Sequence, residues 1–247
     1  MNENINNLFN FYREVGACPS VSLIEEECFG AVSGQNKDWP QMVFGLNLSR
    51  NPAPDLEQIL TKTVSANLPE FAVCDADIFN MKTLKILREK GIYPVKIWTL
   101  MNTHYSAPVP PEQQANVKIK KLNSCAEIDA FTSLANTELM QSVKMNPILA
   151  KEMIEKNAFG FYGLFAAGEL VSGLLAYSDM ITTGLYFIVT KRAFRGKGLA
   201  AELIRYVTSL YRQKTNKVVL QATQKAVPLY ARLGFSVCGK MVIFWKR

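Results

Sequence analysis

The sequence predicts an α/β protein built on a mixed sheet, with a smaller αβ unit preceding a larger one. Strand-like and helix-like apolar patterns alternate along the second half of the chain, and a shorter series of the same kind occupies the first half. The chain has 247 residues, of which 49% are hydrophobic and 20% charged. It is therefore long enough to bury a sizeable core and too apolar to be disordered.

A proline-rich stretch near the middle marks a boundary between the two units. Residues 106–114 read Ser-Ala-Pro-Val-Pro-Pro-Glu-Gln-Gln, with three prolines in four positions. Proline fixes φ and lacks an N–H donor, so this stretch favours an extended connector over a helix or strand. We therefore expect an N-terminal αβ domain over residues 1–110 and a second domain over residues 115–247.

The second half shows the clearer alternation. A strand is expected over residues 117–121 and helices over 125–140 and 147–156, the latter starting after Asn146, a good N-cap followed by proline. The later elements follow the same alternation: strands over residues 161–167 and 170–177 joined through Gly168-Glu169, a strand over 184–190, a helix with one apolar face at Leu199, Leu203, Ile204, Val207 and Leu210, a strand over 218–221, a helix over 227–233 ended by Gly234, and two short strands within 235–245.

The first half has a thinner version of part of this order. Strands are expected over residues 42–48, 71–74 and 93–100, and helices over 56–66 and 81–90, the second of them ended by Gly91. Residues 87–92, Leu-Arg-Glu-Lys-Gly-Ile, align without gaps with residues 230–235, Tyr-Ala-Arg-Leu-Gly-Phe. Two explanations remain open, a chance agreement between two helix ends and a decayed internal duplication.

Composition restricts the classes of protein and site. The five cysteines have no CxxC spacing and His104 is the only histidine, so a disulfide framework, a zinc site and other metal sites are not expected. His104 itself is expected to be an exposed linker residue. No run of about 18 apolar residues and no signal-peptide pattern occur, which predicts a cytoplasmic protein without membrane contact. The net charge of +7 fits an anionic ligand but is too diffuse to indicate nucleic acid.

The informative stretch is residues 188–200, where a strand ends, a basic glycine-containing loop follows and a helix begins. Glycines let backbone N–H groups approach a ligand closely, and a helix N-terminus adds about half a positive charge. Both features suit a phosphate or pyrophosphate. The basic side chains of this loop strengthen the preference; they are Lys191, Arg192, Arg195 and Lys197.

Three more general interpretations fit this loop to different extents. A Walker A motif is excluded, because no Gly-Lys-Ser/Thr follows at the required spacing. Gly196-x-Gly198-x-x-Ala201 matches a dinucleotide fingerprint, but five residues separate its first glycine from the strand. The next strand also ends at Thr223 without the acidic residue that the fingerprint needs. A basic turn that merely caps the helix is the remaining alternative.

A family resemblance gives a more specific interpretation. Residues 195–200, Arg-Gly-Lys-Gly-Leu-Ala, resemble the Arg/Gln-x-x-Gly-x-Gly/Ala signature of the GNAT superfamily of acyl-CoA-dependent N-acetyltransferases. Residues 184–190 look like the fourth strand of that family. Residues 220–235 resemble its fifth strand, the following helix and its Tyr-x-x-x-Gly-Phe ending. The resemblance implies a GNAT-like acyl-CoA N-acyltransferase fold over residues 115–247, preceded by the smaller αβ domain.

The resemblance also implies roles for individual residues. Main-chain groups of Ile188, Val189 and Thr190 would line the pantetheine and the acetyl carbonyl. Thr223 stands where many relatives have an Asn near the pantetheine, and Tyr230 matches the tyrosine beside the thioester sulfur. Tyr230 would then be the general acid; its alternative role is to pack the helix against the sheet. The pyrophosphate would be held by the main-chain N–H groups of the loop formed by Arg195, Gly196, Lys197, Gly198, Leu199 and Ala200.

The general base is not identified by the sequence. Many relatives have a Glu on the fourth strand, whereas residues 182–190 contain no acid. Glu169 and Asp179 are candidates, although their positions in predicted turns favour a solvated, non-catalytic side chain for both, and Tyr186 is a third. Water or bulk solvent is the remaining proton acceptor.

Taken together, the sequence predicts an acetyl-CoA-dependent N-acetyltransferase that acts on a primary amine of a small molecule or peptide. Acetyl-CoA would be the co-substrate, and no metal is expected. The alternative is a non-catalytic acyl-CoA-binding or regulatory module. The first half lacks a comparable phosphate loop and should bind no CoA; we expect it to form one wall of the acceptor site or to mediate pairing into a homodimer.

Overall fold

The fold was analysed in a computed structural model of the whole chain. The structure describes residues 2–46, 52–65, 70–73, 81–104, 116–140, 143–212, 214–215 and 217–246. The predicted linker over residues 106–114 lies outside these ranges.

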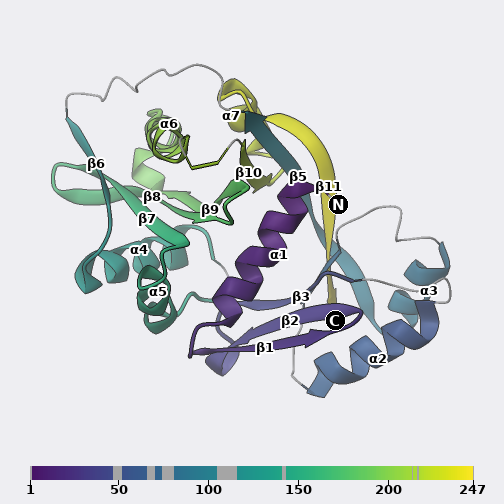
Figure 1. Cartoon of the computed structure of the whole chain (residues 1–247). Helices are drawn as coiled ribbons and strands as arrows, with labels where there is room; N and C mark the ends of the chain where they lie inside the picture. Colours follow the sequence, from purple (N-terminus) through teal and green to yellow (C-terminus); the bar gives the residue numbers. More distant parts are fainter. Residues whose placement is uncertain are drawn as a thin grey trace.

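One mixed sheet runs through the molecule (Figure 1). Within the described residues it has eleven strands in the order β1-β2-β3-β4-β11-β5-β10-β9-β8-β7-β6. The strands are β1 (Val21–Glu26), β2 (Phe29–Gly34), β3 (Gln41–Phe44), β4 (Glu70–Val73), β5 (Ile92–His104), β6 (Val117–Lys121), β7 (Phe159–Ala166), β8 (Glu169–Ser178), β9 (Thr182–Thr190), β10 (Lys217–Ala222) and β11 (Ser236–Lys246). The predicted α/β fold with a mixed sheet is confirmed.

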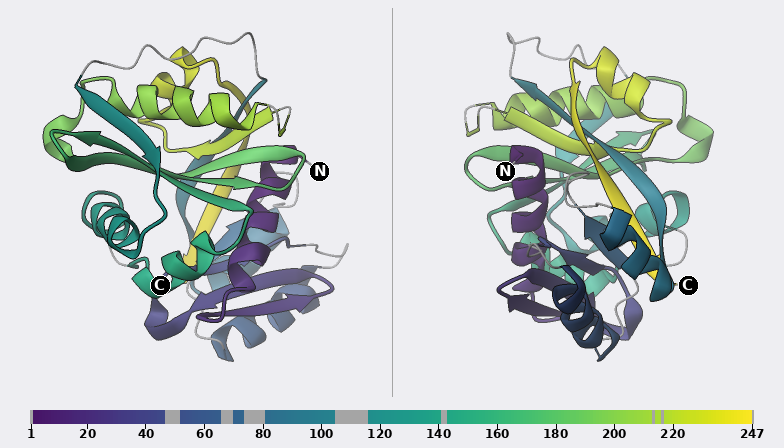
Figure 2. Two further views of the ribbon diagram at one scale, coloured as in Figure 1. Left: turned by 60° about the vertical axis from the view of Figure 1, so that its left-hand side comes forward. Right: turned by 90° about the vertical axis from the view of Figure 1, so that its right-hand side faces the viewer.

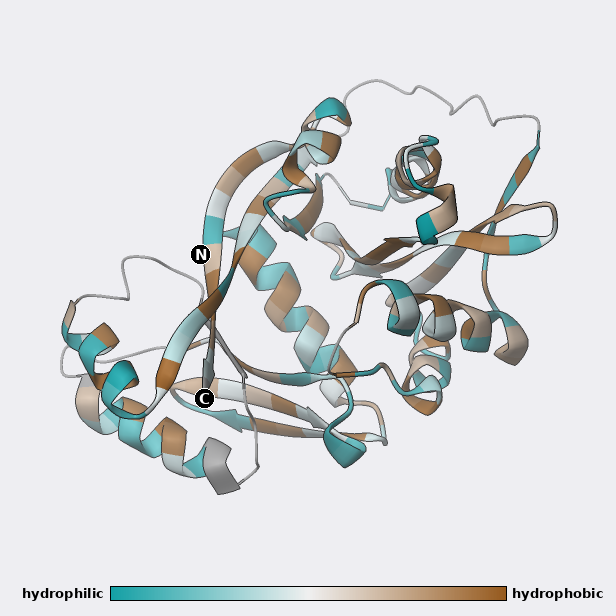
Figure 3. Cartoon of the chain, turned by 180° about the vertical axis from the view of Figure 1, so that it is seen from behind, coloured by the Kyte–Doolittle hydropathy of each residue, from teal (hydrophilic) through white to brown (hydrophobic). Residues whose placement is uncertain are grey.

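Helices cover both faces of the sheet. Side chains of α6 (Leu199–Tyr211) and α7 (Val227–Arg232) share one apolar cluster with one face. Those of α1 (Glu3–Gly16), α4 (Cys125–Glu138) and α5 (Pro147–Ile154) share a second cluster with the other face. A third cluster holds α2 (Pro52–Ser65) and α3 (Met81–Glu89) against the first-half strands. In Figure 3 the central helix α1 carries both apolar and polar positions, as expected of a helix with one buried face.

The second half follows the predicted order of elements closely. Asn146 caps α5 through its side chain, with Pro147 at the first helical position, and Gly234 adopts a left-handed φ of 86° after α7. Three details differ. The β7–β8 turn is Ala167-Gly168, so Glu169 begins β8; Leu210 is exposed and Tyr211 is buried in its place; and residues 236–246 form a single bulged strand. The long final strand was missed because Gly239 and Lys240 interrupt its apolar pattern.

The first half contains strands and helices at the predicted places, although β3 and α2 begin earlier, β3 ends earlier and β5 is longer. Residues 47, 48, 66 and 74 of the predicted elements lie outside the described ranges. His104 is the last residue of β5, where it pairs with Lys217. The prediction that it belongs to the linker was therefore wrong. Three further elements, α1, β1 and β2, were not predicted. α1 contains Asn4 and Asn7 on its buried face, and these polar residues obscure the apolar stripe on which a sequence prediction depends.

The two halves share the central part of the sheet. β5, from the first half, lies between β10 and β11, and β11, from the second half, lies between β4 and β5. The two long strands run antiparallel side by side (Figure 2). The sheet is therefore continuous across the predicted boundary near residue 110, and the division into two domains remains a prediction.

The arrangement around the β5–β11 pair is close to two-fold symmetric. β3 and β4 are parallel on one side, as β9 and β10 are on the other. Extending the gap-free alignment of residues 87–92 with 230–235 matches Trp98 with Met241 and Val95 with Cys238. Trp98 and Met241 are paired in the ladder, and its two irregularities skip Val95 and Cys238. Matched residues thus occupy symmetric places.

Candidate active site

The candidate site lies where β9 and β10 separate. The two strands are parallel, and their ladder ends at the pair Val219 and Gly184. β9 continues to Thr190 and β10 to Ala222, yet in the described residues no further pairs join them. Backbone groups of β9 beyond Gly184 therefore lack β10 as a partner on this side, which leaves an edge to which an extended ligand can hydrogen-bond.

A bulge in β9 reshapes this edge. Phe187 has a left-handed φ of 49°, which is costly for a residue with a bulky side chain. The β8–β9 register shifts at the same place, since Leu175 pairs with Tyr186 but Gly173 pairs with Val189. As a result, Tyr186 and Phe187 both join the cluster on the α1, α4 and α5 face. Bulges next to active sites commonly redirect backbone or side-chain groups, and this one has that position.

The predicted phosphate loop follows β9 directly. Gly196 and Gly198 have left-handed φ values of 79° and 80°, and Gly198 is the N-cap of α6. Alternating left-handed residues in front of a helix turn successive N–H groups toward one concave surface. Leu199, the first residue of α6, is buried, and Ala200 beside it is half-buried. Both glycines thus have backbone conformations that side-chain-bearing residues rarely adopt.

The charges of the loop are more balanced than the sequence indicates. Lys191 forms an ion pair with Glu169, and Arg195 forms one with Glu138 at 2.7 Å. Lys197 extends over the Phe194 ring, with its Nζ 5.0 Å from the centroid. Because two of the four cations already have acidic partners, the attraction for an anion depends largely on the main-chain N–H groups and on the α6 N-terminus.

A comparison with protein-family models matches residues 128–244 with the acetyltransferase (GNAT) domain. Residues 128–244 form a GNAT domain. This match supports acyl-CoA N-acyltransferase activity. It includes β9, the phosphate loop, α6, β10 and α7, which are the elements that carry the candidate site. A search of curated proteins gave no match.

Solved structures extend the likeness to the first half of the chain. A GCN5-related N-acetyltransferase from Kribbella flavida is 16% identical, with a TM-score of 0.68, and the match covers 99% of this chain and 96% of that one. A functionally unknown conserved protein from Staphylococcus epidermidis is 14% identical, with a TM-score of 0.68 and coverages of 91% and 93%. A tandem GNAT protein from the clavulanic acid biosynthesis pathway is 9% identical, with a TM-score of 0.62 and coverages of 98% and 94%. At these identities the likeness shows the fold.

Tyr230 occupies α7 of the GNAT domain, close to the end of β10. It is 8% exposed and its ring packs edge-on to Phe235, with centroids 6.0 Å apart. Burial raises the pKa of Tyr230 to about 12, so its hydroxyl keeps its proton at neutral pH. Thr223 follows β10 and is exposed, with its carbonyl accepting from the Ala226 N–H at 2.9 Å.

Two of the three β9 residues that the resemblance places beside the acyl donor, Val189 and Thr190, have main-chain carbonyls that already accept hydrogen bonds from side chains. The Val189 carbonyl accepts from Ser172 Oγ at 2.8 Å, and the Thr190 carbonyl accepts from Arg195 Nε at 2.9 Å. Ile188 lies in the bulge and packs toward the α6 face. These bonds fix the end of β9, while the bulge at Phe187 and Ile188 keeps its backbone groups outside both ladders.

Two candidates for the general base are engaged in local structure. Asp179 accepts from the main-chain N–H groups of Ile181 at 3.1 Å and Thr182 at 2.8 Å, which is the geometry of a turn residue. Glu169 is held by Lys191 at the start of β8. The geometry therefore favours the structural interpretation of both acids over a catalytic one.

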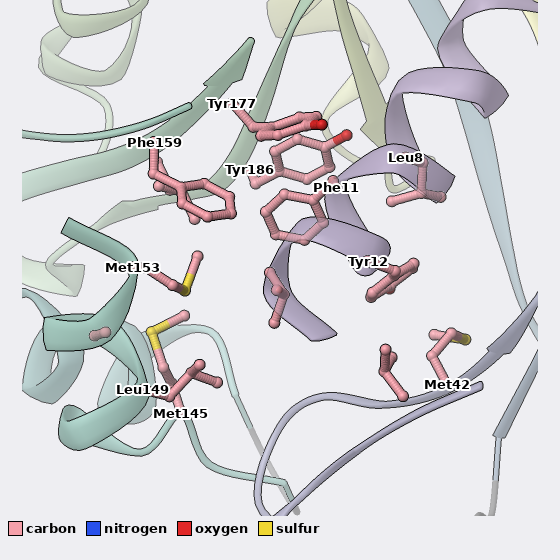
Figure 4. Packing of buried hydrophobic residues seen from close by; sticks show 14 of the residues in the cluster. Leu8, Phe11, Tyr12, Met42, Met145, Leu149, Met153, Phe159, Tyr177 and Tyr186 are labelled. Atoms are coloured by element: carbon pink, nitrogen blue, oxygen red, sulfur yellow. The ribbon is translucent and has the colours of Figure 1, made fainter. Parts of the chain in front are cut away.

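The third candidate, Tyr186, lies inside the core (Figure 4). Its ring stacks on Phe11 of α1, with centroids 4.0 Å apart, and its hydroxyl donates to Asn7 Oδ1 at 2.7 Å. Burial raises the pKa of Tyr186 well above its ordinary value. A buried hydroxyl that already donates to Asn7 favours a role in the core for Tyr186 over a role as the base.

The sequence analysis expected the first half to form one wall of the acceptor site, but it did not single out Trp39, the residue of that half that contacts the bulge. Trp39 packs edge-on to Phe187, with centroids 4.8 Å apart. The Trp39 main-chain N–H donates to the Lys144 carbonyl at 2.8 Å, and Asn146 Nδ2 donates to Asp38 Oδ2 at 3.2 Å. The loop before β3 therefore reaches both the bulge and the segment between α4 and α5. Only the aromatic character of Trp39 could have drawn attention to it.

In the described ranges no helix is both long and apolar enough to cross a membrane. In the same ranges no three His, Cys, Asp or Glu side chains are grouped so that they could hold a metal ion.

Proposed function

We propose that this protein is an acetyl-CoA-dependent N-acetyltransferase that transfers the acetyl group to a primary amine. The observation that carries the proposal is the bulge at Phe187 beside the unpaired edge of β9, directly followed by the left-handed glycine loop. The loop suits a pyrophosphate, the free strand edge suits an amide-containing arm, and the bulge suits a carbonyl that becomes an oxyanion. These three features follow one another along the chain in the order of the parts of acetyl-CoA.

The proposed reaction is a direct attack. A neutral amine nitrogen bonds to the thioester carbon, and main-chain N–H groups at the bulge stabilise the negative charge that forms on the oxygen. The carbon–sulfur bond then breaks, Tyr230 donates its proton to the leaving sulfur to give the free thiol, and water returns a proton to Tyr230. The proton that the amine loses passes to water or bulk solvent, because each of the three sequence candidates is engaged elsewhere.

The test is acetyl-CoA binding by calorimetry, followed by thiol release with a panel of small amines and peptide N-termini. We expect saturable binding and thiol release that depends on the amine. Binding without release on any amine would contradict catalysis and favour a non-catalytic acyl-CoA-binding module. Absence of binding would overturn the proposal as a whole.

We propose further that the first half is a decayed copy of the second that now forms one wall of the acceptor site. The symmetric ladder of β5 and β11, with bulges at Val95 and Cys238, supports duplication over chance agreement. The contact of Trp39 with Phe187 supports the role at the acceptor site, since Phe187 lies on the face opposite α6 and α7. Pairing of two chains into a homodimer is the other role to be tested, by light scattering.

Replacing Trp39 by alanine should weaken acceptor binding selectively. Loss of one aromatic wall removes about 1.5 kcal/mol of contact, so the KM for the amine should rise about tenfold. The Kd for acetyl-CoA should stay within about twofold, because Trp39 lies on the other face of the sheet from α6. Trp39→Phe, which keeps an aromatic ring, is the matched control. An unchanged amine KM, or a loss confined to acetyl-CoA binding, would exclude this role for Trp39.

A further inference from the structure

Glu138, the last residue of α4, binds the phosphate loop at two points. Its Oε1 accepts from the Arg192 main-chain N–H at 2.9 Å, and its Oε2 accepts from Arg195 Nη2 at 2.7 Å. The Glu138 side chain is only 14% exposed although the Arg195 side chain is 50% exposed. The carboxylate is thus sheltered beneath the loop, where such bonds are stronger than on an open surface.

Arg195 completes the connection on the other side. Its Nε donates to the Thr190 carbonyl at 2.9 Å, at the end of β9. One guanidinium therefore joins the strand end to the helix end, using the fork geometry that lysine lacks. Since these nitrogens face Thr190 and Glu138, Arg195 acts on the shape of the loop more than on the charge of a bound phosphate.

We infer that Glu138 is a positioning residue that holds the phosphate loop in its binding shape and connects it to α4. The face of the sheet that α1, α4 and α5 cover is called the acceptor face here, since the proposed amine would approach from it. The inference rests on the proposed function for its ligand, acetyl-CoA, but the loop contacts exist without that ligand. α4 packs in the cluster of the acceptor face, whereas α6, which the loop precedes, packs on the other face. Glu138 is thus a direct polar connection between the two faces beside the end of β9.

Removing the Glu138 carboxylate should change CoA affinity in opposite directions depending on whether Glu138 neutralises charge or positions the loop. If Glu138 only neutralised Arg195, then Glu138→Ala would leave the site more positive and tighten binding of the anionic CoA. If Glu138 positions the loop, the freed N–H groups lose their common direction and binding weakens. Hydrogen bonds that involve a charged group contribute about 1.5–3 kcal/mol, which corresponds to a loss of at least about tenfold.

The experiment compares Glu138→Ala, Glu138→Gln and wild type in calorimetry with CoA and with pantetheine, which lacks the pyrophosphate. We expect Glu138→Ala to raise the CoA Kd about tenfold or more and to leave pantetheine affinity unchanged. Glu138→Gln, which keeps an acceptor oxygen for Arg192, should recover part of the loss. Asp129→Ala removes an exposed ion pair with Lys151 from the same helix and is the control that should change neither ligand.

Amide hydrogen exchange on the ligand-free protein separates this inference from the proposed function. Glu138→Ala should speed exchange at residues 192–198 about tenfold and leave β9 and α6 protected. Faster exchange at these residues in a protein that does not bind CoA would uphold the positioning role and overturn the proposed function. Tighter CoA binding, equal losses for CoA and pantetheine, or unchanged exchange would overturn the positioning role.

Discussion

Gly196→Asp is expected to abolish measurable acetyl-CoA binding. Gly196 has a left-handed φ of 79° in the phosphate loop, and an added Cβ would meet no atom within 4 Å. The variant therefore keeps the space that it needs, and aspartate tolerates a left-handed backbone better than most residues. Its carboxylate would, however, lie where the two negative charges of a pyrophosphate are proposed to bind.

The size of this effect follows from Coulomb's law. Two like charges about 5 Å apart repel by about 3 kcal/mol at an effective dielectric constant of 20, and the pyrophosphate carries more than one charge. We therefore expect the Kd to rise at least about 100-fold in calorimetry, and the loss to become smaller at high salt.

The chain offers a closely matched control for this substitution. Gly168, in the β7–β8 turn, has a left-handed φ of 83° and likewise shows no atom within 4 Å of an added Cβ. Gly168→Asp therefore introduces the same charge and the same backbone strain outside the phosphate loop. We expect it to bind acetyl-CoA within about threefold of wild type. Equal losses in both variants would mean that net charge or instability, and not the loop, explains the result.

The loop could be predicted because its chemistry is local. Gly196 and Gly198 are needed where φ is positive, and the motif places them next to a strand end and a helix start. The bulge that completes the site could not be predicted in this way. Phe187 adopts a left-handed φ only because the surrounding strands and Trp39 hold it there, and a phenylalanine in an apolar run indicates an ordinary strand.

The order of the strands in the sheet also could not be predicted, because it depends on contacts that a local sequence pattern does not contain. Apolar patterns predict a strand over residues 93–100 and strand pieces within 235–245, but they do not show which strands lie beside them. The placement of β11 between β4 and β5, and of β5 between β11 and β10, depends on contacts between residues far apart in the sequence. The buried asparagines of α1 are a second example, since Asn4 is explained only by the carbonyls of Met101 and Leu220, to which it donates at 2.8 and 3.0 Å.

Because β5 lies among strands of the second half, residues from the first half reach the face of the sheet that α1, α4 and α5 cover. β5 brings that half alongside β10, and α1 then extends from Leu220 toward Tyr186 and Trp39. The face opposite α6 is thereby filled with aromatic rings as far as Tyr186. If the proposed acceptor approaches the bulge from this face, we expect it to contact Phe187 and Trp39, so that the acceptor preference depends on the loop before β3.

Tyr230→Phe is expected to lower kcat about 100-fold and leave acetyl-CoA affinity within about threefold. General acid catalysis by a positioned side chain contributes about 100-fold or more, and phenylalanine keeps the ring that packs against Phe235. Tyr162→Phe is the matched control, because Tyr162 is another buried tyrosine of the α6 cluster and its hydroxyl donates to Tyr211 at 3.4 Å. An equal fall in both variants would indicate a packing effect.

The pH dependence provides an independent check of the role of Tyr230. Its pKa of about 12, raised by burial, keeps the hydroxyl protonated across the usual range, so kcat should show no falling limb below about pH 11. The acceptor behaves oppositely: a lysine-like amine has a pKa of about 10.4, and only its neutral form attacks. With no side chain to remove the proton, kcat/KM should rise about tenfold per pH unit up to that value. A plateau near pH 7 would instead reveal a general base, whereas a falling limb near pH 8.5–9 in wild type that persists in Tyr230→Phe would assign the proton donor to another group.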